Sequence, residues 1–486
     1  MSEQKDYKNI FKATGLFGGV QIISIVFSII KTKIVAIWLG TTGFGIISIF
    51  NSTTTLISSL TNLGLQTSSV REIASAKDSD SLYEKISVTN KLAIATSVIG
   101  TLITIVISPL LSRWFFHNSD YIFPFILLSS VIFLTGLYNQ CYAILQGLRK
   151  LTFLAVSSVL GAFFGLIISI SLYYFIGEQG IVWSLVLTAL ITFIIGYIYV
   201  KKTSVLYYSI PVKNALKKGL PVLKLGIYIA LSNNVAYLVQ FLLKAYLSNV
   251  ADVAEVGLFQ AGWSLNTMYV GMVFTAMSKD YYPRLCQSAN INSALSDKMN
   301  EQAEIGLLLL APMVVLMMAF IDPVLNLLYS DEFLSVAPMT TMLLFGTLIQ
   351  VASWSLGYVF LAKSDGKIYF INEVGTKVLM FPTYIIGYSI GQLEGLGVAF
   401  IVNQLIYIVW VGIVAKRRYS IMYSRKFLKL FAIIISVSTA HLLINRLFSE
   451  IVMWNWVFVI IISAYSLYQL NERIKILKTI KSRIKK

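Results

Sequence analysis

Fourteen mostly apolar stretches, each close to the length that crosses a bilayer as a helix, follow one another along this chain. Of the 486 residues, 57% are hydrophobic and 13% are charged, and the mean hydropathy is +0.76. This balance excludes a soluble globular protein and predicts an all-α polytopic membrane protein with about 14 transmembrane helices. The predicted spans are residues 11–39, 44–66, 91–112, 122–146, 152–175, 180–200, 219–247, 255–276, 303–321, 337–361, 368–391, 395–415, 427–447 and 451–470.

Lysine and arginine are distributed unevenly between the predicted loops. With the N-terminus in the cytoplasm, alternate loops hold nearly all cations, for example Lys416, Arg417 and Arg418, whereas the other loops are short and acidic. The positive-inside rule therefore accounts for the net charge of +17 better than nucleic-acid binding does. It places both termini in the cytoplasm. The polar start of the chain predicts no cleavable signal peptide.

An internal repeat with a period of about 210–216 residues divides the chain. Lys33 and the sequence GTTGFGIISIFNS correspond to Lys244 and ADVAEVGLFQAGWS. We predict an N-lobe at residues 1–205 and a C-lobe at 206–420, with two further helices and a basic tail at 421–486. Each lobe has six spans and thus the same orientation, so a pseudo-two-fold axis along the membrane normal and a central cavity are expected.

Two lysines lie in the first span, where a charge is expensive unless it faces protein or water or reaches an interface. Gln21, Ser24, Ser28 and Lys31 form one polar stripe on a helix. Lys33 points about 200° away from Lys31 on an ideal helix, so the two lysines cannot share a face of a straight helix. The stripe favours Lys31 as the residue that faces a hydrophilic cavity.

Three further polar stripes occur on corresponding spans of the two lobes. They comprise Asn51, Thr55, Ser58 and Asn62; Asn233, Tyr237, Gln240 and Lys244; and Gln260, Ser264 and Thr267. We predict that these stripes line one chamber. Hydrogen bonds between helices for the neutral residues, and snorkelling for the lysines, are the alternatives. The candidate substrate-binding residues are Lys31, Lys33, Lys244, Asn51, Thr55, Asn233, Gln240 and Gln260.

Glu373 and Lys377 are spaced one helical turn apart in the eleventh span. They predict either a structural ion pair or a carboxylate that couples transport to an H⁺ or Na⁺ gradient.

No catalytic or metal-binding pattern is apparent in the sequence. Cys141, Cys286, His117 and His441 are isolated, and there is no Walker A motif. The GxxxG spacing of Gly161 to Gly165 predicts helix packing. We expect no enzyme activity, no cofactor, no metal and no nucleic-acid partner.

Three stretches resemble a known family. The sequences ATGLFGGVQIISIVFSIIKTKIVAIWLGTTGFGIISIFNS, EVGLFQAGWSLNTMYVGMVFTAMSKDYYPRL and GYVFLAKSDGKIYFINEVGTKVLMF are similar to Wzx-type O-antigen and lipid III flippases. These flippases belong to the multidrug/oligosaccharidyl-lipid/polysaccharide (MOP) exporter superfamily. The resemblance extends from about residue 12 to about residue 420 and is weak in the last two spans.

The resemblance implies a flippase of the bacterial inner membrane. It would move an undecaprenyl-pyrophosphate-linked oligosaccharide, such as an O-antigen repeat unit, from the cytoplasmic to the periplasmic leaflet by alternating access. Basic residues in relatives correspond to Lys33 and Lys244. Implied partners are the lipid-linked glycan, membrane lipids and polysaccharide polymerase machinery. The alternatives are a drug/cation antiporter of the same superfamily and a membrane partner of a glycan polymerase.

Overall fold

The fold is entirely helical over the residues that the computed structural model describes, which are 19–20, 23–76, 78–204, 211, 218–219, 234–447 and 452–474. Where the predicted spans fall on these residues, they coincide with helices. Nine described stretches are long and apolar enough to cross a membrane, and two of them, Leu151–Lys201 and Gly366–Tyr419, each hold two predicted spans. The prediction of an all-α polytopic membrane protein is confirmed.

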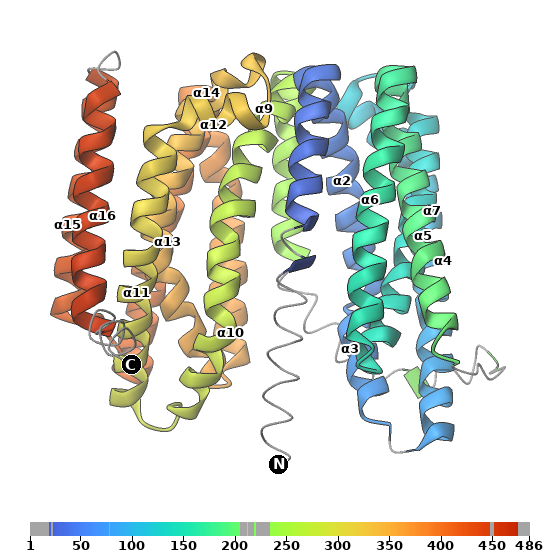
Figure 1. Ribbon diagram of the computed structural model, residues 1–486, viewed down its shortest axis with the longest axis horizontal. Coiled ribbons are helices and arrows are strands. Elements are labelled where there is room, and N and C mark those ends of the chain that lie inside the picture. The colour runs from blue at the N-terminus through green and yellow to red at the C-terminus, as the bar shows by residue number, and fades with distance from the viewer. Residues whose placement is uncertain are drawn as a thin grey trace, which may run out of the picture. The chain divides into compact units, whose positions relative to one another are not determined.

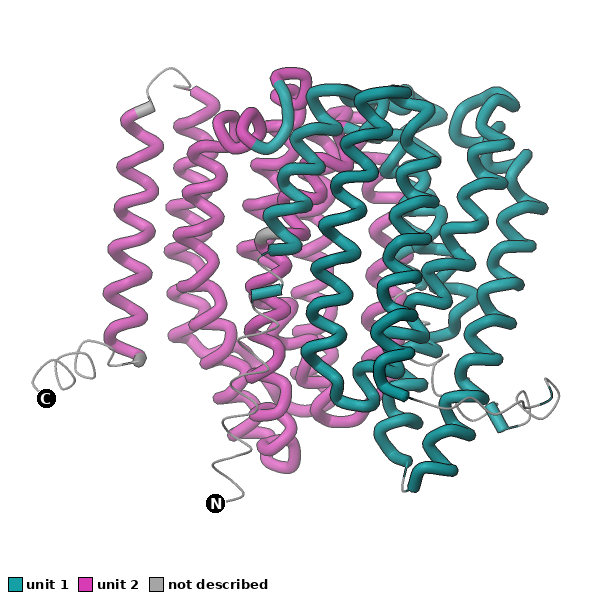
Figure 2. The backbone as a smooth tube through the Cα atoms, turned by 45° about the vertical axis from the view of Figure 1, so that its right-hand side comes forward, with its two compact units in different colours: residues 1–257, 328–330 teal, residues 258–327, 331–486 magenta. Residues whose placement is uncertain are grey.

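Two compact units make up the chain (Figure 2). Unit 1 comprises Met1–Gly257 and Leu328–Ser330, and unit 2 comprises Leu258–Leu327 and Asp331–Lys486. The helix of residues 234–250 therefore groups with unit 1 by its contacts, although the sequence repeat assigns it to the second lobe. The predicted lobes describe the repeat rather than these contacts, and the lobe boundaries stay a prediction.

Unit 1 is built from long helices that run back and forth. Helices α4 to α7 lie side by side in Figure 1, where α4 packs on α5 and α6 packs on α7. The bounds are 23–38, α2 (Gly40–Asn62), α3 (Leu65–Ala74), α4 (Ser79–Phe116), α5 (Ile122–Gly147), α6 (Leu151–Ile176), α7 (Gly180–Lys201) and 234–250.

The turn between α6 and α7 explains why these two helices pack closely. Gly177 adopts φ 57° and ψ −135°, a conformation open to glycine because it has no Cβ. The short 3₁₀ turn that follows, Gly177–Gln179, sends the chain back along α6. A Cβ on Gly165 would come within 2.7 Å of the Thr188 side chain of α7, so the helix-packing role predicted for the Gly161–Gly165 spacing is confirmed.

Unit 2 contains a helix with a sharp internal kink. Helix α14 (Gly366–Tyr419) is interrupted by non-helical geometry at Gly391 and Gln392, which separates its two predicted spans. Helices α15 and α16 pair with each other and pack on α11 (Figure 1). The other bounds are α9 (Val253–Leu265), α10 (Gly271–Gln287), α11 (Asn292–Ala319), α12 (Ile321–Leu328), α13 (Ala337–Ala362), α15 (Arg425–Leu447) and α16 (Val452–Ile474). Residues 253–257 of α9 and Leu328 of α12 belong to unit 1.

Candidate functional site

The two lysines of the helix 23–38 have different surroundings. The Lys33 ammonium donates a hydrogen bond to the backbone carbonyl of Tyr329, and the Ser330 hydroxyl donates to the carbonyl of Ala36 at 3.3 Å. Residues 328–330 thus pack along the end of this helix within unit 1. Lys31 is half-buried and has no hydrogen-bond or ion-pair partner in the described part of the chain. The two predicted ligands therefore have different surroundings: the Lys33 ammonium is anchored to a backbone carbonyl, and the Lys31 ammonium is not.

Lys244 is the most buried of the cations described in unit 1, with an exposed fraction of 6%. Its ammonium donates to the backbone carbonyl of Ser48 on α2, over a long distance of 3.4 Å. An ammonium has three protons to donate, so this contact leaves most of its capacity unused. A buried charge with so little compensation is destabilising, which makes Lys244 a candidate functional residue.

Helix α2 lies between these cations in the sequence and presents its polar row away from its packed face. The packed face includes Ile49 and Thr53, both buried, whereas Asn51 and Thr55 are exposed. One face of α2 therefore packs against neighbouring helices, and the opposite face carries accessible polar side chains. The accessible set matches the two residues that the sequence predicts as hydrogen-bonding ligands.

The helix 234–250 is joined to its neighbours in unit 1 by polar contacts. The Ser59 hydroxyl of α2 donates to the Asn234 side-chain oxygen, and the Ser248 hydroxyl donates to the carbonyl of Phe115. Gln240 is half-buried. Asn233, a predicted ligand, lies outside the described residues. Unit 1 thus brings together Lys244, Ser48 and the α2 helix that carries Asn51 and Thr55.

The remaining predicted residues belong to unit 2. Gln260 donates to the Ser264 hydroxyl at 2.6 Å along the polar stripe of α9. The Glu373 carboxylate pairs with Lys377 at 2.8 Å and accepts a hydrogen bond from the Tyr407 hydroxyl at 2.6 Å. Both carboxylate oxygens are engaged, one by each partner. This geometry holds the two halves of α14 together.

A π-helix, η2 (Asn266–Val270), joins α9 to α10. The buried Asn266 side chain accepts a hydrogen bond from Thr347 of α13 at 2.8 Å. Short π-helical segments are frequent at functional sites, where they change the direction of a helix. The polar stripe of Gln260, Ser264 and Thr267 leads into this segment. Sequence analysis did not find it, because a π-turn has no composition signal of its own.

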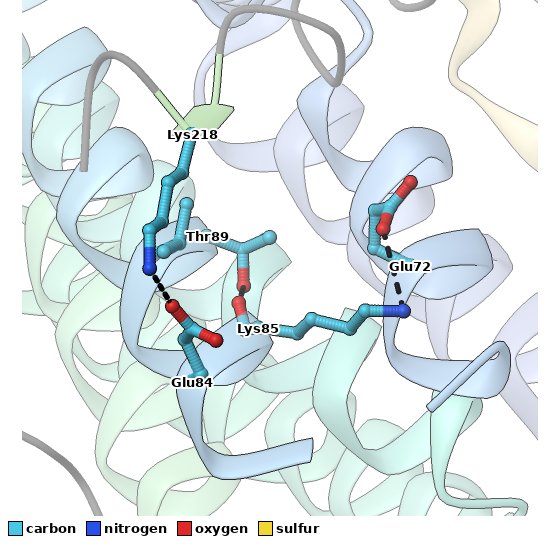
Figure 3. Close-up of a pocket in the computed structure, with 6 residues that line it drawn as sticks. Glu72, Glu84, Lys85, Thr89 and Lys218 are labelled. Atoms are coloured by element: carbon cyan, nitrogen blue, oxygen red, sulfur yellow. Dashed lines mark hydrogen bonds and ion pairs between the residues drawn. The ribbon is translucent and has the colours of Figure 1, made fainter. Parts of the chain in front are cut away.

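A charged pocket lies at the start of α4 in unit 1 (Figure 3). Lys85 pairs with Glu72 of α3 at 3.6 Å, and Lys218 pairs with Glu84, across a cavity of about 250 Å³. Thr89 closes the inner side and accepts a hydrogen bond from Gln140 at 2.8 Å. Because its two cations are matched by two carboxylates, the pocket gives no net attraction for an anion. Its ion pairs fasten α3 and the Lys218 segment to α4.

A sequence profile of a family described as polysaccharide biosynthesis protein matches residues 34–338, more than half of the chain. The chain belongs to this family. This member of the polysaccharide biosynthesis protein family is also similar to the lipid III flippases of Escherichia coli (strain K12) and Shigella flexneri. Each comparison gives 22% identity over 376 residues, which cover 75% of this chain and 88% of the relative.

Solved structures of two kinds share the fold of this family member. The lipid II flippase MurJ in an inward closed conformation gives a TM-score of 0.70 at 13% identity, covering 96% of this chain and 99% of that one. An inward-facing multidrug resistance MATE family transporter of the MOP superfamily gives 0.65 at 16% identity, covering 82% and 94%. The predicted fold, which is that of flippases and transporters of this kind, is confirmed. These relatives are named as flippases and transporters, in agreement with the prediction that the chain is not an enzyme.

Proposed function

We propose that this protein is a flippase for a lipid-linked oligosaccharide, which it moves across the inner membrane of a bacterium by alternating access. The observation that supports this most directly is the set of three lysines on the helices 23–38 and 234–250 of unit 1, which lie in two spans predicted from the sequence. Lys31 is unpartnered among the described residues and Lys244 is buried with one weak hydrogen bond. The similarity to lipid III flippases supports the same substrate class.

The proposed chemistry follows from charge and hydrogen bonding. A glycan and pyrophosphate would lose their water in hydrocarbon without replacement, at a prohibitive free energy. Lys31, Lys33 and Lys244 would compensate the pyrophosphate charge, because an ammonium in a poorly solvated site attracts an anion strongly. Asn51, Thr55, Asn233, Gln240 and Gln260 would donate hydrogen bonds to the sugars. The polyprenyl tail stays in the lipid throughout.

The proposal also covers the membrane topology, the substrate and the energy source. Both termini lie in the cytoplasm, because the positive-inside rule places the basic loops there. An O-antigen repeat unit or a similar oligosaccharide linked to undecaprenyl pyrophosphate is the proposed substrate, and polymerase machinery would use the product. An H⁺ or Na⁺ gradient is the proposed energy source. Glu373 and Lys377 act structurally, since both oxygens of the carboxylate already have partners.

A drug/cation antiporter is the second candidate, because the MATE transporters share the fold. The charges of unit 1 argue against it. Residues 23–62 and 234–250 contain three lysines and neither aspartate nor glutamate. Lysines repel a cationic drug, whereas they attract a pyrophosphate. The antiporter is therefore the weaker candidate.

Deletion of the gene, followed by complementation with variants, tests the proposal. Loss of surface glycan together with accumulation of lipid-linked repeat units facing the cytoplasm is the expected result. Lys31→Ala, Lys33→Ala and Lys244→Ala should each fail to restore delivery while the variant still inserts in the membrane. Lys298→Ala, at an exposed helix end, is the matched control and should restore it. Retained surface glycan with reduced dye export would instead favour the antiporter.

A further inference from the structure

The kink of α14 creates a groove in unit 2 that the proposed flippase reaction does not use. The two halves of the helix touch at Gly387 and Gly395, where a Cβ on either residue would meet the other's carbonyl oxygen within 2.4 Å. Beside this contact lies a cavity of about 480 Å³. Its lining comes from both halves of α14 and from Arg446 near the end of α15. Its volume lies in the range of pockets that hold small molecules.

The walls of the groove are mostly apolar and lie open at the protein surface. Ile386, Val398, Ala399 and Val402 line it together with Ile390, which is 82% exposed. Thr383 also lines it, eight residues before the kink at Gly391. At 1.5 Å per residue the lining runs roughly 12 Å along the helix. That length is close to one leaflet of a hydrocarbon core about 30 Å thick. The groove therefore fits an acyl chain of a single leaflet.

The mouth of the groove carries one charge of each sign. Arg446 pairs with Glu394 at 3.1 Å, and their side chains are 71% and 36% exposed. Within the described chain neither residue has another charged partner. The contact uses one guanidinium nitrogen and one carboxylate oxygen. Arg446 therefore keeps spare donors for a phosphate, and Glu394 keeps one oxygen for an ammonium.

We propose that this groove binds a phospholipid whose headgroup contains both a phosphate and a primary ammonium, as in phosphatidylethanolamine. One acyl chain lies against Val398 and Val402, the phosphate contacts Arg446, and the ammonium donates to Glu394. A purely anionic headgroup is disfavoured because Glu394 repels it. A choline headgroup has no N–H to donate to the carboxylate. The pyrophosphate of a polyprenyl-linked substrate meets the same repulsion as an anionic lipid. The site is thus a lipid site distinct from the proposed substrate path.

Native mass spectrometry of the purified full-length protein tests this assignment. Phosphatidylethanolamine, phosphatidylglycerol, phosphatidylcholine and a polyprenyl phosphate are titrated separately against the protein in mild detergent. The wild type should prefer phosphatidylethanolamine over the other three lipids. Glu394→Gln should weaken its binding by about tenfold and reverse the preference towards phosphatidylglycerol, because the repulsion is gone and the ammonium loses a charged acceptor. Arg446→Gln should weaken the binding of both phosphatidylethanolamine and phosphatidylglycerol.

A second pair of variants separates groove binding from general lipid association. Val402→Trp fills the groove and should weaken phosphatidylethanolamine binding by about tenfold, on the scale of a lost buried alkyl contact. Val409→Trp, on the same helix but outside the groove, is exposed and should bind as the wild type does. Equal binding by these two variants overturns the proposal. So does a wild type that prefers polyprenyl phosphate, or a Glu394→Gln protein with unchanged headgroup preference. Monodisperse elution and an unchanged melting temperature establish that each variant is folded.

Discussion

The Glu304 carboxylate of α11 accepts a hydrogen bond at 2.7 Å from the Arg473 guanidinium of α16, with which it forms an ion pair. Both side chains are buried, at 9% and 11% exposed, and Lys426 of α15 lies 3.8 Å from the same carboxylate oxygen. This cluster ties the last two helices to α11 at one end. Because the groups are buried, the loss of one partner leaves an uncompensated charge.

Glu304→Gln should therefore lower the free energy of unfolding by about 3 kcal/mol. Replacement of both residues, Glu304→Leu with Arg473→Met, should recover much of that loss, since no charge remains buried. Thermal unfolding of the purified protein measures both. Lys298→Gln is the matched control on the same helix, because its pair with Glu301 is exposed and worth at most about 1 kcal/mol. Equal effects of Glu304→Gln and Lys298→Gln contradict the buried-cluster interpretation.

Helices α2 and α9 approach each other through glycine in unit 1. A Cβ on Gly45 would lie 1.9 Å from the carbonyl oxygen of Val253, and a Cβ on Gly257 would lie 2.0 Å from that of Thr41. Gly45→Ala and Gly257→Ala should each destabilise the protein by about 1–3 kcal/mol, because backbone atoms must move apart. Gly271→Ala has open space around it and should stabilise by about 0.5–1 kcal/mol. Melting temperatures that fall equally for all three variants would contradict the close approach.

The helices could be predicted from the sequence because apolar length and the positions of lysine and arginine determine where a chain crosses a bilayer. The site could be predicted only in part. The polar stripes select Lys31 and Lys244 as candidate ligands, and this stays a prediction. They could not foresee that Lys33 would contact Tyr329, almost 300 residues away. Such a contact depends on tertiary packing, which leaves no periodic signal in the sequence.

The same limit applies to acidic residues. Glu304 lies at the edge of a predicted span, and its ion pair with Arg473 joins residues 169 positions apart. The sequence signal was present, because Arg473 and Lys426 are cations at the ends of the last two spans. It could not be used without knowing which helix packs against them. The pairing of Glu373 with Lys377 was predictable because it is local, whereas the contribution of Tyr407 was not.

Asp365 is the N-cap residue of α14, and the pH dependence of protein stability should depend on its carboxylate. Tyr419 donates to the Asp365 carboxylate at 2.6 Å and Arg418 pairs with it at 2.6 Å, and these contacts hold the pKa of Asp365 below its usual value. A carboxyl with a lowered pKa stabilises the fold above its unfolded pKa, about 3.9, and this contribution is lost as the pH falls through the folded pKa. The wild type should therefore lose more stability than Asp365→Asn below about pH 4.

Thermal unfolding between pH 6 and pH 3 measures this difference. Tyr419→Phe should show an intermediate profile, because it removes one of the contacts that lower the pKa of Asp365 and leaves the others. Parallel profiles for the wild type and Asp365→Asn would show that the cap contributes nothing through its charge.

The Glu373–Lys377 pair should be structural rather than coupled to an ion. Glu373→Gln leaves Lys377 without its carboxylate and should destabilise the protein by about 1–3 kcal/mol. The double variant Glu373→Gln with Lys377→Met removes both charges of the pair and should recover stability and glycan delivery together. Measurement of delivery with the H⁺ or Na⁺ gradient dissipated separates the alternatives. A stable double variant that no longer responds to the gradient would identify Glu373 as the coupling carboxylate instead.

Substitution of Lys244 should change transport without lowering stability, so it distinguishes a functional from a structural role. The residue is 6% exposed and its ammonium makes one hydrogen bond of 3.4 Å, so its burial is poorly compensated. Lys244→Met keeps the apolar stem and removes the charge, so the melting temperature should stay equal or rise, because an apolar group replaces a poorly solvated ion. Delivery of the lipid-linked glycan should nevertheless be lost. Lys298→Met should change neither property. If Lys244→Met lowered the melting temperature by several degrees, the lysine would be structural, and the role proposed for it in charge compensation would be wrong.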